Sequence, residues 1–133
     1  MTKHRTITLT DRRPVQIDEQ EWPVIARADG SSFGDGDPSR YEQARHRGEI
    51  DEYIMIVRQH ADGRALVYAV VSAAISAWSQ PAGGVDYRGG ELLEPGEDLV
   101  EAIRRVGQAA ATESVMPTHM IRECIADLPA ETI

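Results

Sequence analysis

The chain contains little cysteine and no long apolar run. Its 133 residues include one cysteine, Cys124, which excludes an internal disulfide and fits a reducing compartment. It has no uncharged apolar run of about 18 residues, the length that a membrane span requires. The basic segment 1–13 lacks the apolar core of a signal peptide. We therefore expect a cytoplasmic protein that does not span a membrane.

Motifs for metal, phosphate and nucleophilic chemistry are also missing from the sequence. The four histidines lie in separate segments, with no pair at ligand spacing and no CxxC. No serine lies in a GxSxG elbow, and Cys124 falls on the apolar face of a predicted helix, where we expect a buried thiol. The pairs Gly83-Gly84 and Gly89-Gly90 match no phosphate-binding loop and are expected in turns. These observations predict a protein that is not an enzyme and has no catalytic, cofactor or metal site.

Acidic residues outnumber basic ones, and the net charge is −8. Residues 1–13 carry a net +3 and residues 53–88 a net +1, whereas residues 14–52 and 89–133 each carry −6. An acidic body repels phosphate backbones, so direct nucleic-acid binding is disfavoured and a partner with a basic surface is favoured. A more ordinary interpretation is that the charge keeps the domain soluble.

The segment 52–72 is the strongest structural signal. It reads EYIMIVRQHADGRALVYAVVS, with Asp62-Gly63 between two β-branched runs, which predicts a β-hairpin. Both faces of its first strand are apolar, so we expect a central strand covered on both sides. The continuation over residues 69–79 fits either a strand or a helix; we favour a strand to about Trp78. An exposed apolar strand there would be a surface for a homodimer.

Shorter signals complete the fold. We expect strands at 5–10, 15–17 and 87–93, and a short helix between Asp18 and Ala28, where Asp18 and Glu21 have capping-box spacing. Residues 96–111 and 116–128 have the apolar periodicity of helices. The chain therefore predicts one α+β domain over residues 1–133, with an antiparallel sheet of four or five strands centred on the hairpin and two C-terminal helices packed on one face.

Two acidic regions and one mixed cluster are the candidate surfaces. The segment 29–51 reads as a long acidic loop, and the first C-terminal helix begins with acids, of which Glu101 can pair with Arg105. Arg58, His60, Asp62 and Arg64 surround the hairpin tip and are expected to be solvated. The candidate partner-binding residues are Asp35, Asp37, Glu42, Glu49, Asp51, Glu94, Glu97, Asp98 and Glu101.

Five blocks of sequence carry a resemblance. They are TITLTDRRPV (6–15), EWPVIARA (21–28), VRQHADGRALVY (57–68), EAIRRV (101–106) and ECIADLPAE (123–131). The chain thereby resembles small, largely uncharacterised accessory proteins carried on bacterial plasmids and integrative conjugative elements. The resemblance implies an accessory role: regulation, stability or countering host defences. The acidic loop and the Ala/Ser-rich stretch 69–80 depart from that group.

The expected function is therefore protein–protein contact through an acidic surface, directed at a host nucleic-acid-binding defence complex. Two alternatives stay open. One is a dimeric DNA-binding regulator that uses Lys3, Arg5, Arg12 and Arg13. The other is a small enzyme or ligand-binding domain with a pocket that contains His60 or His119.

Overall fold

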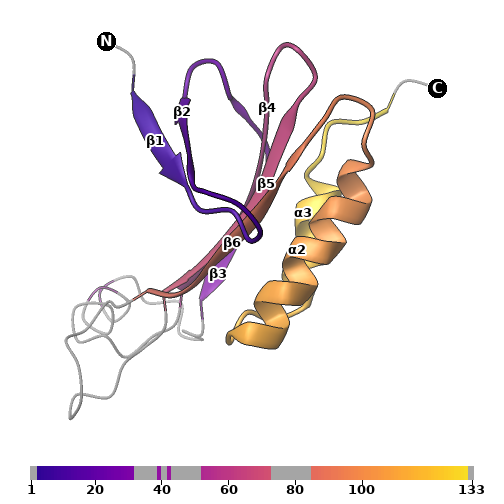
Figure 1. Cartoon of the computed structure of the whole chain (residues 1–133). Coiled ribbons are helices and arrows are strands. Elements are labelled where there is room, and N and C mark those ends of the chain that lie inside the picture. The colour runs from indigo at the N-terminus through magenta and orange to yellow at the C-terminus, as the bar shows by residue number, and fades with distance from the viewer. Residues whose placement is uncertain (1–2, 32–38, 40–41, 43–51, 73–84, 132–133) are drawn as a thin grey trace.

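The fold is α+β and has three layers, as a computed structural model of the chain shows (Figure 1). The structure describes residues 3–31, 39, 42, 52–72 and 85–131. A four-stranded antiparallel sheet in the order β3-β4-β5-β6 forms the middle layer. Its strands are β3 (Val24–Ser31), β4 (Glu52–Gln59), β5 (Ala65–Ser72) and β6 (Val85–Leu93). A two-stranded hairpin, β1 (His4–Ile7) with β2 (Val15–Asp18), covers one face, and α2 (Leu99–Glu113) with α3 (His119–Ala126) covers the other.

The predicted hairpin lies at the centre of this sheet. β4 and β5 pair from Glu52 with Ser72 to Gln59 with Ala65. At the tip the amide of Gly63 donates to the carbonyl of His60 over 2.9 Å, and Gly63 has a φ of +97°, a conformation that favours glycine. The sequence signal for the hairpin is therefore confirmed. The predicted extension to Trp78 lies outside the described residues beyond Ser72.

Both faces of the central strands are buried, as the sequence predicted. Met55, Val57 and Val67 are 0% exposed and face the helices, while Leu66 is 0% exposed and faces the β1–β2 hairpin. Two separate cores result, one on each side of the sheet. The helix side also buries Cys124, and this burial raises the pKa of its thiol to about 11.

Three expectations need correction. The segment 18–28 is not a helix: one turn closes where the amide of Trp22 donates to the carbonyl of Asp18, and β3 follows from Val24. Pro23 explains the difference, because proline has no amide hydrogen to extend a helix. Gly89-Gly90 lies inside β6 rather than in a turn; a Cβ at Gly90 would lie 2.5 Å from the carbonyl oxygen of Val67. Glu101 pairs with Arg104 rather than with Arg105.

Hydrogen bonds from distant residues cover both edges of the sheet. At the β3 edge, the amide of Arg27 donates to Oδ2 of Asp127 over 2.8 Å. At the β6 edge, the amide of Thr10 donates to the carbonyl of Gly90 over 2.9 Å, and the amide of Gly90 donates to Oγ1 of Thr10 over 3.1 Å. Such contacts block the pairing of an exposed edge with another chain.

One buried charge joins the hairpin layer to the sheet. Arg58 is 6% exposed; its Nε donates to the hydroxyl of Tyr68 and its Nη1 to the carbonyl of Trp22, each over 2.9 Å. Its Nη2 lies 3.5 Å from Oε1 of Glu19, which also pairs with Arg5. The hydrogen bond from Arg5 lowers the pKa of the Glu19 carboxyl, which therefore stays charged opposite Arg58.

We expect Arg58→Ala to lower the free energy of unfolding by about 3 kcal/mol, because it leaves buried acceptors without a donor. Arg5→Ala removes an exposed partner of the same carboxylate and should cost less than about 1 kcal/mol. Urea unfolding measures both values. Equal losses in the two variants would contradict the assigned role of Arg58.

A second test concerns the contact between the helices. A Cβ at Gly107 of α2 would overlap the side chain of Ile121 of α3. We expect Gly107→Ala to destabilise by about 1–3 kcal/mol through overpacking, although alanine favours the helix by about 1 kcal/mol. In an Ile121→Ala background the overlap is gone, so Gly107→Ala should stabilise. A double-mutant cycle by urea unfolding would refute the close packing if the sign did not reverse.

Candidate functional site, an acidic groove

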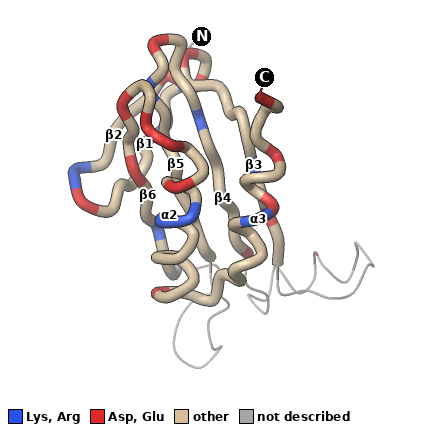
Figure 2. The backbone as a smooth tube through the Cα atoms, turned by 90° about the vertical axis from the view of Figure 1, so that its right-hand side faces the viewer, with Lys and Arg blue, Asp and Glu red and all other residues tan. Residues whose placement is uncertain are grey.

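A groove of about 780 Å³ lies where α2 begins, α3 ends and β3 starts. Its apolar lining comes from all three elements and from the segment after α3: Ile25, Leu99, Val100, Ile125, Leu128 and Pro129. Glu97, Asp98 and Glu131 are the charged residues that line it. Figure 2 shows acidic positions gathered at this end of the molecule, around the connection from β6 to α2 and past the end of α3. The groove thus combines an apolar floor with an acidic rim.

Backbone amides hold two of these carboxylates in place. Oδ1 of Asp98 accepts from the amides of Val100 at 2.9 Å and Glu101 at 3.3 Å and so caps α2. Oε2 of Glu97 accepts from the amide of Glu94 over 2.7 Å. Gly96, with a φ of +89°, lets the chain turn between Glu94 and Glu97. The charges of Glu97 and Asp98 are therefore fixed relative to the groove.

The rim keeps its negative charge. Arg104 pairs with Glu101 and Arg105 with Glu91, so the two cations nearest the start of α2 are already neutralised. Within the described ranges, Glu97, Asp98 and Glu131 form no ion pair. The helix N-terminus contributes about half a positive charge, which three carboxylates exceed.

The structure describes five of the nine predicted acidic residues. Glu97 and Asp98 line the groove, and Glu94 and Glu101 flank them in the chain. The segment 32–51 joins Ser31 to Glu52 at the opposite end of β3 and β4, about 23 Å away for strands of this length. Glu42 is helical and exposed, and Asp35, Asp37, Glu49 and Asp51 lie outside the described residues. Ser31 and Glu52, which the segment 32–51 joins, are therefore far from the groove.

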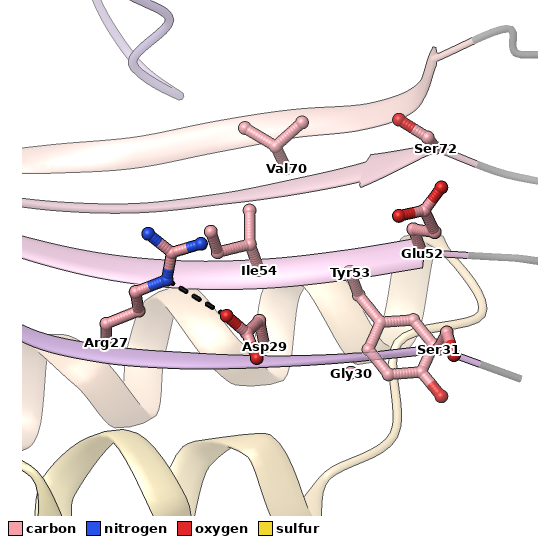
Figure 3. A pocket seen from close by; sticks show the side chains of 9 residues that line it. All are labelled: Arg27, Asp29, Gly30, Ser31, Glu52, Tyr53, Ile54, Val70 and Ser72. Atoms are coloured by element: carbon pink, nitrogen blue, oxygen red, sulfur yellow. Dashed lines mark hydrogen bonds and ion pairs between the residues drawn. The ribbon is translucent and has the colours of Figure 1, made fainter. Parts of the chain in front are cut away.

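A second hollow, of about 540 Å³, lies at that opposite end (Figure 3). The side chains of Ile54 and Val70 lie along its inner wall, with those of Glu52 and Ser72 nearer the strand ends. On β3, Nε of Arg27 lies 3.0 Å from Oδ2 of Asp29. The lining is thus of mixed charge, unlike the uniformly acidic groove.

The hairpin-tip cluster is not uniformly solvated. Arg58 is buried, whereas Asp62 and Arg64 pair at the surface over 2.8 Å. Arg64 lies 5.2 Å above the ring of Trp22, and His60 lies 5.1 Å from it, centroid to centroid. Trp22 was not among the residues predicted for this cluster. Its place after the turn at Asp18 brings it to the tip.

The structure also describes the residues on which the two alternative functions depend. Of the four cations of the DNA-binding alternative, Arg5 pairs with Glu19. His60 lines a hollow beside the hairpin tip with Gln20 and Glu21. His119 lines a groove of about 560 Å³ between α2 and α3, together with Arg104 and Arg122.

Comparison of the chain with known protein families, curated proteins and solved structures found no match. Among the described residues, no three or more histidine, cysteine or acidic side chains are grouped so as to hold a metal ion. Over the same residues, none of the helices has the length and apolar character needed to cross a membrane. The geometry of the groove therefore carries the functional argument.

Two substitutions at Asp98 distinguish its role as the cap of α2 from its charge. We expect Asp98→Ala to lower the free energy of unfolding by about 1 kcal/mol, since it removes the N-cap acceptor of α2. Asp98→Asn keeps a capping oxygen and should stay within about 0.5 kcal/mol of the parent. Thermal and urea unfolding compare the two variants. An alanine variant as stable as the parent would show that the cap is not needed.

Proposed function

We propose that this protein acts without catalysis, by binding a protein partner that presents a basic surface to the acidic groove. The observation that carries the proposal is the group of three carboxylates, Glu97, Asp98 and Glu131, that rim an apolar floor and form no ion pair within the described ranges. An apolar floor supplies affinity through burial. Charges on the rim supply orientation, a fast encounter and discrimination against acidic partners.

The same proposal covers the biological setting. The sequence blocks that resemble plasmid and conjugative-element proteins support an accessory role in the cytoplasm of a bacterial host. A nucleic-acid-binding defence complex is the partner we propose, because a surface that grips phosphates is basic and is attracted to an acidic one. The raised pKa of Cys124, about 11, supports a non-enzymatic role, since a thiol of this kind is a poor nucleophile at neutral pH.

The test is an affinity pull-down from a nuclease-treated bacterial lysate, followed by mass spectrometry. The parent should retain one stoichiometric protein that is lost at high salt, because exposed charge pairs are screened. Glu97→Gln/Asp98→Asn/Glu131→Gln should weaken this binding about tenfold, as expected for three rim charges worth about 0.5 kcal/mol each.

A matched control removes three exposed acids elsewhere, as Asp11→Asn/Glu113→Gln/Glu123→Gln, and changes the net charge equally. If both triple variants lose the partner to the same degree, net charge rather than the groove attracts it. If neither loses it, the proposal fails. A further variant neutralises Asp35, Asp37, Glu49 and Asp51 together. Its pull-down tests whether the segment 29–51 contributes to the same contact.

A further inference from the structure

The acidic groove continues past the start of β3. Ile25 and Gln59, which line the groove, also line the hollow beside the hairpin tip that contains His60. This tip hollow has a volume of about 780 Å³. That hollow is bounded further by Glu21, Pro23 and His60. The two hollows therefore adjoin at Ile25 and Gln59. Together they are called the furrow, which extends from the β4–β5 tip across the edge strand to the segment after α3.

The furrow has one sign of charge along its length. Glu21 lines the tip end, and Glu97, Asp98 and Glu131 line the helix end. No lysine or arginine is among the lining residues of either hollow. The side chain of Glu21 is 66% exposed, and its Oε2 lies 4.0 Å from Nε2 of His60. A ligand that lies along the furrow therefore meets carboxylates near both ends and an aliphatic side chain, Ile25, between them.

The β3 edge limits how a ligand can bind. The furrow crosses β3 at Ile25, where the pairing register with β4 shifts between Val24 and Ala26. Two residues further on, the amide of Arg27 is already bonded to Asp127. The register shift and the occupied amide both disfavour strand addition along β3, so we assign recognition at the furrow to side chains.

We propose that the furrow binds an extended segment of the partner in which aliphatic residues lie between two lysine or arginine residues. This inference rests on the proposed function and specifies the form of its partner. Cations of the segment lie against the carboxylates at the two ends, and aliphatic side chains pack on Ile25 and Leu128. A segment one chain wide fits a furrow that crosses the edge strand at a single residue, Ile25.

The probe is a positional-scanning library of immobilised eight-residue peptides, each about 26 Å long when extended. We expect the parent protein to select lysine or arginine at two separated positions and aliphatic residues between them. Gln59→Lys places a cation where the two hollows meet and should weaken binding of the selected peptide about tenfold. Gln108→Lys, the same substitution at an exposed position on α2, is the control and should leave affinity unchanged.

Backbone amide chemical shifts of the full chain locate the bound peptide. Changes at His60, Ile25 and Leu128 together support the furrow. If a basic peptide binds but Gln59→Lys has no effect and shifts are confined to the start of α2, the furrow is wrong and the acidic groove stands. If no peptide binds while the lysate yields a salt-sensitive partner, the partner presents a folded surface, and again only the furrow fails. Selection of acidic peptides would overturn both proposals.

Discussion

The structure depends on the burial of β4 and β5 on both faces. An antiparallel sheet often leaves one face in water, but here the residues of either face are apolar, with Val57 on one side and Leu66 on the other, each 0% exposed. Two covering layers are then required, and the β1–β2 hairpin and the α2–α3 pair supply them. The burial of Arg58 follows from the same constraint, because its strand position points into the hairpin layer. Its charge is tolerated there through Tyr68, Trp22 and Glu19.

The groove forms where the helical layer stops. At that end the start of α2 and the end of α3 meet the edge strand, and the exposed start of a helix requires acceptors for its amides. Asp98 supplies one and so carries a charge to the groove for a structural reason. The negative charge of the groove and the stability of α2 therefore both depend on the Asp98 side chain. A substitution that keeps the capping oxygen but removes the charge separates these two properties.

The sequence predicted the parts of the fold that depend on local signals. Asp62-Gly63 located the hairpin, and the apolar spacing located both helices, although α3 is shorter than residues 116–128. The helix expected at 18–28 was wrong, because the capping spacing at Asp18 was local whereas pairing with β4 is not. Alternate residues of a strand face the same side, so Arg58 of β4 shares a face with Ile54 and Ile56. This alternation would have predicted the burial of Arg58. The groove was not predictable from periodicity, because Ile25, Leu99 and Leu128 come together only through tertiary packing.

The hydrogen bonds that cover the two edges of the sheet differ in when they can form. Thr10 precedes Gly90 by 80 positions, so it has already been synthesised when β6 emerges. Asp127 follows Arg27 by 100 positions, and at about 5–20 residues per second its synthesis comes on the order of 5–20 s later. Asp127 follows Gly90 by 37 positions, about 2–7 s at the same rate. The partner of the β6 edge is therefore made before that strand, and the partner of the β3 edge is made last.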